Sequence, residues 1–325
     1  MGVSPKLQNK MRYLCFGIFF AVSAYCESNL AIVLNSGDET LSIIDTKAMR
    51  ETRRVPIGKE PHHLMASPDD KFVIIANAAS NELVFLDRTS GEIVNRVKNI
   101  SDPYQIGYSP DRKWFVSVSL RLDRVDIYKP DGFQIVKRLP LPRAPSHLAF
   151  SPDSKMVFIT LQDTNQLAAI DLDSQTIVWK LPIGRQPAGI MMTPDGKYLM
   201  IGILGDNYVE VIDWKARKQF KKIITGKGAH NFMRLGDGKH VFLSNRAENT
   251  ISKINMETLS VVDSYPAPGG PDCMDLTADQ RYLWMTSRWA RKVSILDLQT
   301  KQIVKQIPVG RSPHGIYLAA HAPRR

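Results

Sequence analysis

Cysteine is scarce in this chain. Only three of the 325 residues are cysteines, namely Cys15, Cys26 and Cys273. Three widely spaced thiols cannot form a framework of disulfides, so burial and strand pairing must hold the fold together. We expect Cys273 to be a small buried apolar residue of a first strand; the alternative is that it joins a site beside Asp272.

The sequence also lacks the short motifs that identify many catalytic sites. It contains no phosphate-binding glycine loop, no nucleophile elbow and no His-Glu-x-x-His metal signature. No stretch shows the periodicity of an amphipathic helix. The lack of helical periodicity favours an all-β protein. The lack of catalytic motifs leaves its reaction unassigned.

One apolar run stands out, at residues 13–24, and it follows the basic residues Lys6, Lys10 and Arg12. A basic segment followed by about a dozen apolar residues is typical of a secretory signal peptide, and such a run is too short to span a bilayer comfortably. We therefore expect residues 1–26 to be a signal peptide. Residues 27–325 then form one exported domain, periplasmic or secreted, with no stable transmembrane segment.

The chain is basic. Its formal net charge is +11, and it becomes +8 when the three cations of the signal segment are removed. A positive surplus of this size favours anionic ligands, acidic protein surfaces or nucleic acid as partners.

A repeat of 42 residues runs through the whole domain. Its clearest mark is a turn of the Ser-Pro-Asp type, whose aspartate recurs at Asp69, Asp111, Asp153, Asp195, Asp237 and Asp279. Each unit contains four β-rich runs of about five residues, with turn residues between them. Four short strands in a unit of about 40 residues are typical of a propeller blade, so the sequence predicts a seven-bladed β-propeller with four antiparallel strands per blade.

The phase of the repeat predicts how the ring closes. Residues 30–33 match the second strand of a unit, whereas residues 313–316 match a first strand. The two ends of the chain therefore complete one shared blade, which leaves no free sheet edge between the first and last units.

The repeat resembles the YVTN-type propeller repeat, most clearly in Gly184-Arg185-Gln186-Pro187 and Thr193-Pro194-Asp195. The resemblance covers essentially all of the domain. This superfamily includes periplasmic proteins of the YncE kind, the haem-binding propeller of cytochrome cd1 nitrite reductase and lactonase-like enzymes. The resemblance implies a fold, and it does not by itself imply a reaction.

Alternate loops of a propeller lie on opposite faces. We define the turn face as the side that holds the Ser-Pro-Asp turns, and the mouth face as the side that holds the loops preceding each first strand. One repeat position of the mouth face carries five cations with few acidic neighbours in sequence, which are Lys59, Arg143, Arg185, Lys227 and Arg311. Adjacent loops of the same face add Arg121, Arg246 and Arg288. This pattern predicts a basic channel mouth that attracts anions.

Histidines gather at the repeat position just after the repeated proline. That position is occupied by His62, Tyr104, His230, Asp272 and His314, and by Ser146 and Ala188 in the other two blades. Because equivalent positions of seven blades surround one channel, we expect these side chains to face its mouth. Imidazole and carboxylate groups suit zinc, copper or iron, so His62, His230 and His314 are candidate metal ligands; anion binding and a merely polar lining are the alternatives. We expect His63 and His147, one position further on, to point away from the channel.

Three functions are consistent with these patterns. The leading one is a monomeric exported propeller that binds an anionic small molecule or a protein surface on its basic, His-bearing mouth face, with nucleic acid as a less favoured partner. The second is a haem- or metal-associated redox or maturation protein similar to the cytochrome cd1-type propellers, with haem or a transition metal as cofactor. The third is a lactonase-like hydrolase, which would need Asp272 to act with the histidines.

Overall fold

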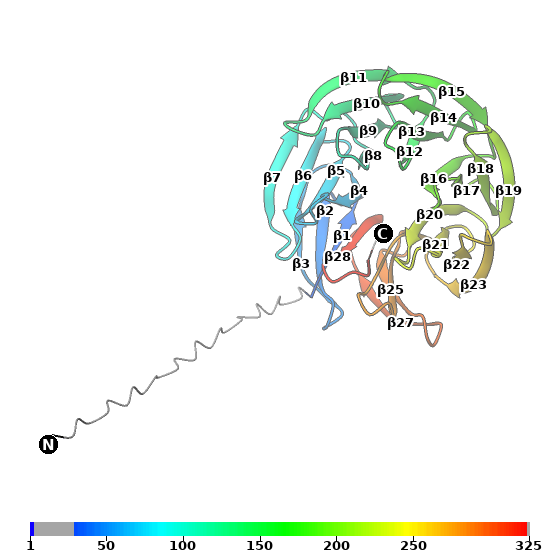
Figure 1. Cartoon of the computed structure of the whole chain (residues 1–325). Coiled ribbons are helices and arrows are strands. Elements are labelled where there is room, and N and C mark those ends of the chain that lie inside the picture. The colour runs from blue at the N-terminus through cyan, green and yellow to red at the C-terminus, as the bar shows by residue number, and fades with distance from the viewer. Residues whose placement is uncertain (3–28, 324–325) are drawn as a thin grey trace.

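The computed structural model describes residues 1–2 and 29–323, and these residues form 28 β-strands in seven four-stranded antiparallel sheets. The sheets stand around a central channel as the blades of a propeller (Figure 1). The predicted all-β, seven-bladed architecture is therefore confirmed. Most of the predicted signal peptide lies outside the described residues. Within the described part, no helix is long and apolar enough to cross a membrane.

The strands occupy four positions, from the channel outward. The inner strands are β4 (Pro61–Ala66), β8 (Gln105–Tyr108), β12 (Pro145–Phe150), β16 (Pro187–Met192), β20 (Ala229–Arg234), β24 (Pro271–Leu276) and β28 (Pro313–Leu318). The second strands are β1 (Leu30–Asn35), β5 (Phe72–Asn77), β9 (Phe115–Ser119), β13 (Met156–Leu161), β17 (Tyr198–Ile203), β21 (His240–Asn245) and β25 (Tyr282–Ser287). The third strands are β2 (Thr40–Asp45), β6 (Glu82–Asp87), β10 (Arg124–Lys129), β14 (Gln166–Asp171), β18 (Tyr208–Asp213), β22 (Thr250–Asn255) and β26 (Lys292–Asp297). The outer strands are β3 (Arg50–Pro56), β7 (Ile93–Lys98), β11 (Gln134–Pro140), β15 (Thr176–Pro182), β19 (Lys218–Ile224), β23 (Ser260–Pro266) and β27 (Gln302–Pro308).

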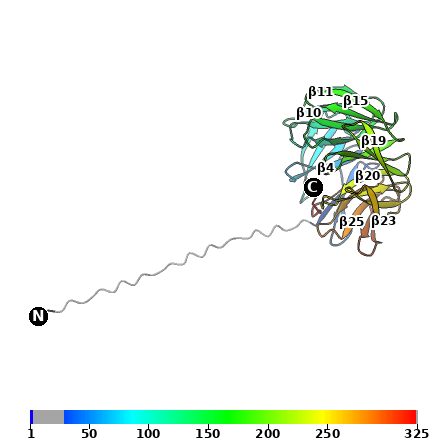
Figure 2. The same cartoon turned by 45° about the vertical axis from the view of Figure 1, so that its right-hand side comes forward.

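The core lies between neighbouring blades. The second and third strands are apolar on both faces, because each blade packs against one neighbour on either side; Val118 of β9, for example, shares a buried cluster with Ile159 of β13. The turned view in Figure 2 shows the blades side by side around the ring, with β11, β15 and β19 on the outside. Outer strands such as β15 alternate between exposed and half-buried residues, as expected of a strand with a single neighbour.

The Ser-Pro-Asp turns are closed by side-chain hydrogen bonds. Ser67 Oγ donates to Asp69 Oδ1 over 2.7 Å, and it accepts from the backbone N–H of Phe72 over 3.0 Å. Lys71 lies 3.6 Å from Asp69 in the same turn, and equivalent ion pairs occur in two other blades. The cations of the turn face are therefore balanced locally, as the spacing of Asp and Lys in the sequence indicates.

The two ends of the chain close the ring, as predicted. β28 pairs with β1 in an antiparallel ladder that joins Ala31 to Leu318 and Val33 to Ile316. The backbone N–H of Gly310 also donates to Asn35 Oδ1 over 3.0 Å. The sheet in the order β28-β1-β2-β3 is therefore complete, and we call it the closing blade.

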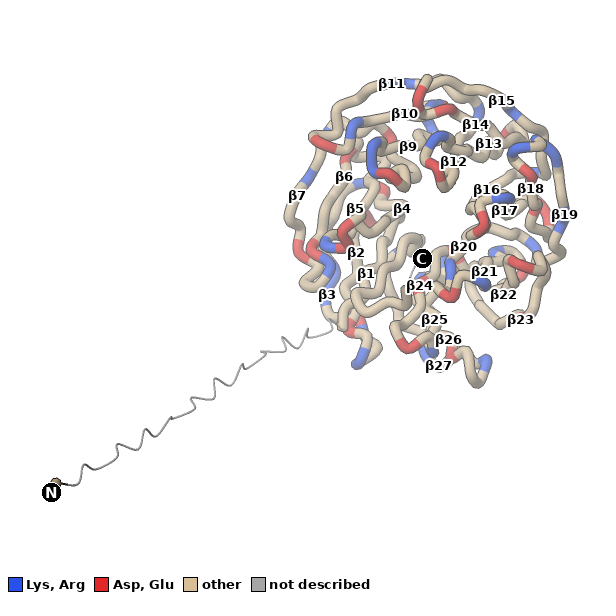
Figure 3. The backbone as a smooth tube through the Cα atoms, viewed as in Figure 1, with Lys and Arg blue, Asp and Glu red and all other residues tan. Residues whose placement is uncertain are grey.

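The positive surplus of the chain lies mainly on the outer strands. The seven outer strands carry twelve Lys and Arg side chains and only two carboxylates, Glu51 and Asp263. Figure 3 shows this basic rim as blue segments along β3, β7, β15 and β19. The net charge alone is thus a poor guide to the charge of the channel mouth.

Removing β28 by ending the chain at Arg311 should destabilise the whole domain. β1 would lose its paired strand, and the neighbouring blade β24-β25-β26-β27 would lose part of the surface against which it packs. All five tryptophans lie outside the closing blade. Trp284 packs against that blade, whereas Trp114, Trp179 and Trp214 pack in other clusters, so the fluorescence of these three reports on the remaining blades. We expect the unfolding midpoints from circular dichroism and from fluorescence to fall together, with loss of most of the roughly 5–15 kcal/mol that stabilises a typical domain. A chain ending at Pro323 is the control and should unfold like the full chain. An unchanged fluorescence transition in the shorter chain would contradict cooperative closure.

Candidate functional site

Five histidines converge at the mouth end of the channel, and we call them the imidazole cluster. His62 and His63 come from β4, His147 from β12, His230 from β20 and His314 from β28. None of them is more than 6% exposed.

The five rings form one continuous group. The ring centroids of His62 and His314 are 3.8 Å apart, those of His63 and His147 are 5.2 Å apart, and those of His147 and His230 are 5.6 Å apart. Tyr104 packs against His62 with a centroid separation of 4.3 Å. The cluster therefore extends across the channel between four blades.

A β-bulge in the inner strands brings His63 and His147 into the cluster. The pairing of β4 with β5 skips from Pro61 to Leu64, and the pairing of β12 with β13 skips from Pro145 to Leu148. A bulge interrupts the strict alternation of a strand, so two consecutive residues can lie on the same side. The expectation that His63 and His147 point away from the channel was therefore wrong.

Asp272 is the only carboxylate among the described residues that contacts these rings, and it is fully buried. Its Oδ2 atom accepts hydrogen bonds from Arg246 over 2.7 Å and from Arg288 over 3.1 Å. Burial alone would raise the pKa of this carboxyl, but the neighbouring His314, Arg246 and His230 hold the pKa well below its ordinary value. Asp272 is therefore a buried negative charge.

Burial also sets the charge of the imidazoles. Because desolvation disfavours the imidazolium form, it lowers the pKa of all five histidines, and it lowers the pKa of His63 to about 3. At neutral pH the cluster is thus uncharged, and each ring carries one N–H and one nitrogen lone pair.

Several of these ring nitrogens have no hydrogen-bond partner among the described residues. They are His62 Nδ1, His63 Nε2, His147 Nε2 and His314 Nε2. An unsatisfied buried polar atom is costly, so these four nitrogens are available to a water molecule or to a ligand.

His314 faces a hydrogen-bond acceptor at each of its two ring nitrogens. Its Nδ1 atom lies 2.8 Å from the carbonyl oxygen of His62, and its Nε2 atom lies 3.5 Å from Asp272 Oδ1. Both neighbours are acceptors, whereas a neutral imidazole can donate from only one nitrogen. No aligned donor reaches Asp272 Oδ1, although His230 Nδ1 is 3.2 Å away. One pair of facing acceptors is therefore left without a cation or a proton between them.

Cys273 packs against a buried apolar cluster that includes Ile316 and Leu318, and it also lies beside this pair. Its Sγ atom accepts from Asn231 Nδ2 over 3.2 Å and lies 3.6 Å from His314 Nδ1. Burial raises the pKa of the thiol well above its usual range. Two sets of potential ligand atoms result, each within 4.8 Å of one another: His62, His63 and His314 in one set, and Asp272, Cys273 and His314 in the other.

The cations predicted for the mouth face fall into three groups. Arg246 and Arg288 cover the cluster, and their side chains are 17% and 24% exposed. Arg311 pairs with Asp38, and Arg121 pairs with Asp102 and Glu60. No ion pair to a described carboxylate is formed by the remaining four, Lys59, Arg143, Arg185 and Lys227. The mouth face is thus less basic than the cations in the loops before each inner strand indicate, because neighbouring loops supply carboxylates.

The pKa values of the cluster predict an acid-sensitive fold. In the unfolded chain the histidines bind protons below about pH 6.5, whereas in the folded protein they stay neutral, His63 down to about pH 3. The unfolded state then binds more protons than the folded state. The free energy of unfolding should therefore fall as the pH drops from 6.5 toward 3, and above pH 6.5 the histidines should not reduce it. Urea unfolding in the presence of a chelator should show a slope against pH that is smaller in His147→Gln by up to about 1.4 kcal/mol per pH unit. Equal slopes in the two proteins would refute this origin of acid sensitivity.

Solved structures of similar fold include two named enzymes and one protein of unknown function. A functionally unknown protein from Desulfotomaculum acetoxidans DSM 771 has a TM-score of 0.77 and 18% identity, over 92% of this chain and 100% of that chain. Dihydro-haem d1 dehydrogenase NirN in complex with DHE has a TM-score of 0.67 and 19% identity, over 90% of this chain and 75% of that chain. Hydrazine synthase of Kuenenia stuttgartiensis has a TM-score of 0.66 and 19% identity, over 80% of this chain and 91% of that chain. At such low identity these similarities show the fold alone.

The comparison by sequence is more specific about the family. No curated protein matches the chain. The model of the YncE-like β-propellers matches residues 18–324, which is nearly the whole chain. The protein therefore belongs to the YncE-like β-propeller family.

Proposed function

We propose that this chain is an exported propeller that binds a transition-metal ion in the imidazole cluster, with His62, His63 and His314 as ligands. The observation that carries the proposal is the pair of facing acceptors, His314 Nε2 and Asp272 Oδ1, which are buried 3.5 Å apart with no donor between them. A cation bound at His314 would remove this conflict, and the set formed by His62, His63 and His314 places two of the unpartnered nitrogens within 4.8 Å of that ring.

The chemistry of the donor atoms supports a transition metal. Neutral imidazole nitrogens suit zinc, copper, nickel and ferrous iron, whereas magnesium and calcium prefer oxygen ligands. The contact of His314 Nδ1 with the His62 carbonyl would hold the ring so that Nε2 keeps its lone pair for the metal. Because burial keeps the imidazoles neutral, protons would compete little with the ion. Asp272 and Cys273 could supply further ligands.

The geometry favours an ion without a macrocycle. The similar NirN structure contains DHE, and a haem-type ligand would need an imidazole nitrogen that is exposed beside a broad flat opening. In the described residues all five imidazoles are buried against one another, and Arg246 and Arg288 cover them. A bare ion fits this arrangement with small shifts of the side chains, and a macrocycle does not fit it.

The exported location is part of the same proposal. It is supported by the basic and apolar pattern of residues 1–26, which is typical of a signal peptide.

Metal binding can be tested by titrating the metal-free protein with Cu²⁺ or Zn²⁺ and by elemental analysis. We expect one ion per chain, and at least about tenfold weaker binding by His62→Ala and by His314→Ala, because each removes one of three ligands. His240→Ala is the matched control, since His240 lies on the turn face and pairs with Asp237. A protein that takes up no metal, or variants that bind like the parent, would contradict the proposal.

A second candidate function is the binding of an anionic ligand or partner on the mouth face. It is favoured by Arg143 and Arg185, which form no ion pair with a described carboxylate and line one hollow of about 450 Å³. Asp163 is the single carboxylate in that lining, so the hollow keeps a positive excess.

Citrate at low ionic strength is a suitable probe for this second function. The double variant Arg143→Glu and Arg185→Glu should bind citrate at least about tenfold more weakly, because attraction becomes repulsion. A double variant with two charge reversals on the outer strands, Lys137→Glu and Lys180→Glu, has the same net charge and is the control. Equal weakening in both double variants would show that only the overall charge matters.

A further inference from the structure

The channel contains a cavity of about 420 Å³ that begins at the imidazole cluster and extends toward the turn face. The inner strands β4, β8, β20, β24 and β28 supply its walls. His63 and Cys273 mark its end at the cluster, and Ala66, Arg234 and Asp275 lie further along the same strands. Its volume lies within the range of pockets that bind small organic molecules.

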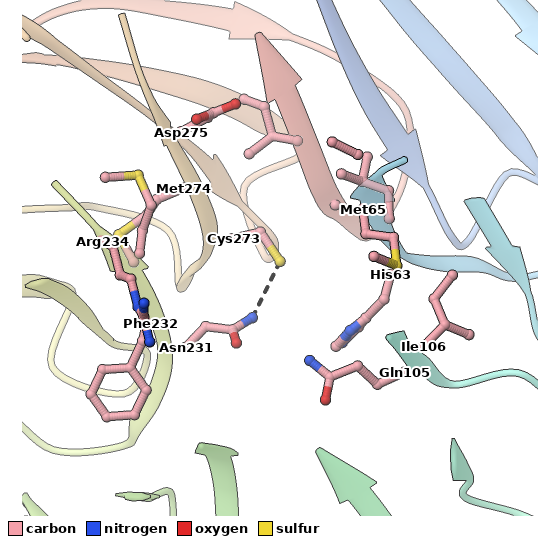
Figure 4. A pocket seen from close by; sticks show the side chains of 15 residues that line it. His63, Met65, Gln105, Ile106, Asn231, Phe232, Arg234, Cys273, Met274 and Asp275 are labelled. Atoms are coloured by element: carbon pink, nitrogen blue, oxygen red, sulfur yellow. Dashed lines mark hydrogen bonds between the residues drawn. The ribbon is translucent and has the colours of Figure 1, made fainter. Parts of the chain in front are cut away.

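The middle of the cavity is apolar. Figure 4 shows Met65, Ile106, Phe232 and Met274 around it, and Ile316 completes the lining. Methionine side chains are flexible and polarizable, so they adapt to apolar groups of different shapes. These walls suit the hydrocarbon part of a ligand.

Arg234 provides one charge without a counter-charge. Its Nη2 atom donates to the Met192 carbonyl over 2.8 Å, and within the described residues it forms no ion pair. Burial lowers the pKa of this guanidinium, and no carboxylate of residues 29–323 forms an ion pair that would offset the cost. An arginine still remains charged at neutral pH, so its desolvated charge favours an anion.

The carboxylate of Asp275 does not fill this role. Its oxygens accept from the backbone N–H groups of Leu276 over 3.0 Å and Leu318 over 2.8 Å. In Figure 4 this carboxylate and the Arg234 guanidinium lie well apart.

We infer that the cavity is a second binding site, which takes a small amphipathic carboxylate: the carboxylate group pairs with Arg234, and the apolar body packs against Met65, Phe232 and Met274. A planar carboxylate matches the fork of donors that a guanidinium presents. The cavity borders the metal ligands only at His63 and Cys273, whereas Arg234 and the apolar walls lie further along the channel, so this second site goes beyond metal binding.

Octanoate and octan-1-ol are matched probes, because they share an apolar chain and differ in the charged group. Calorimetric titration of the full chain with a chelator present should show one octanoate bound, and octan-1-ol bound at least about tenfold more weakly, as the loss of a charged hydrogen bond predicts. Arg234→Met should weaken octanoate by a similar factor and leave octan-1-ol unchanged. Arg50→Met, at an exposed position of the outer strand β3, is the control and should change neither.

A second variant keeps the inference testable if Arg234→Met folds poorly. Met65→Trp should fill the apolar part of the cavity while Arg234 remains, so it should abolish binding of both probes. The inference is overturned if octanoate does not bind, if octan-1-ol binds as tightly, or if both variants bind octanoate like the parent. His62→Ala should keep octanoate binding, so a failure of the metal proposal and a failure of this one give different results.

Discussion

The convergence of seven inner strands on one channel is the constraint on which the rest of the structure depends. A propeller places each repeat position of its inner strands on a ring, so residues 42 apart in sequence become neighbours in space. His62, His230, Asp272 and His314 occupy one such position. A dispersed set of polar residues thereby becomes a single buried cluster, although no two of the four are close in sequence.

The buried charge of Asp272 then organises the cluster. A carboxylate without solvent is tolerated only when cations and hydrogen bonds surround it. Arg246 and Arg288 satisfy one of its oxygens from the mouth side. The other oxygen faces imidazoles that burial keeps neutral, so this side of the carboxylate remains electrostatically incomplete. The arginines thus stabilise the site and cover it, while the unmet demand for positive charge lies deeper in the channel.

Most of the fold could be predicted from the sequence, because a repeat without insertions carries its own register. The turn aspartates, spaced 42 residues apart, mark six blades, and the phase of residues 30–33 and 313–316 adds the closing blade as the seventh. The site could be predicted only in part. Sequence position indicated that His62 and His314 would face one channel mouth, but the bulge after Pro61 that adds His63 has no sequence signature. The pairing of Arg311 with Asp38 joins residues from opposite ends of the chain, so local charge patterns did not reveal it.

The closing blade also determines when the protein acquires its site. β28 follows the other described strands in the chain; it carries His314, and it is also the partner of β1. Until β28 pairs with β1, the earlier blades have no closed ring and the other imidazoles have no fifth member. An incomplete chain therefore exposes open sheet edges and has little affinity for the ion that we propose. Assembly of the cluster thus becomes a final step of folding, and a truncated protein would be both unstable and empty.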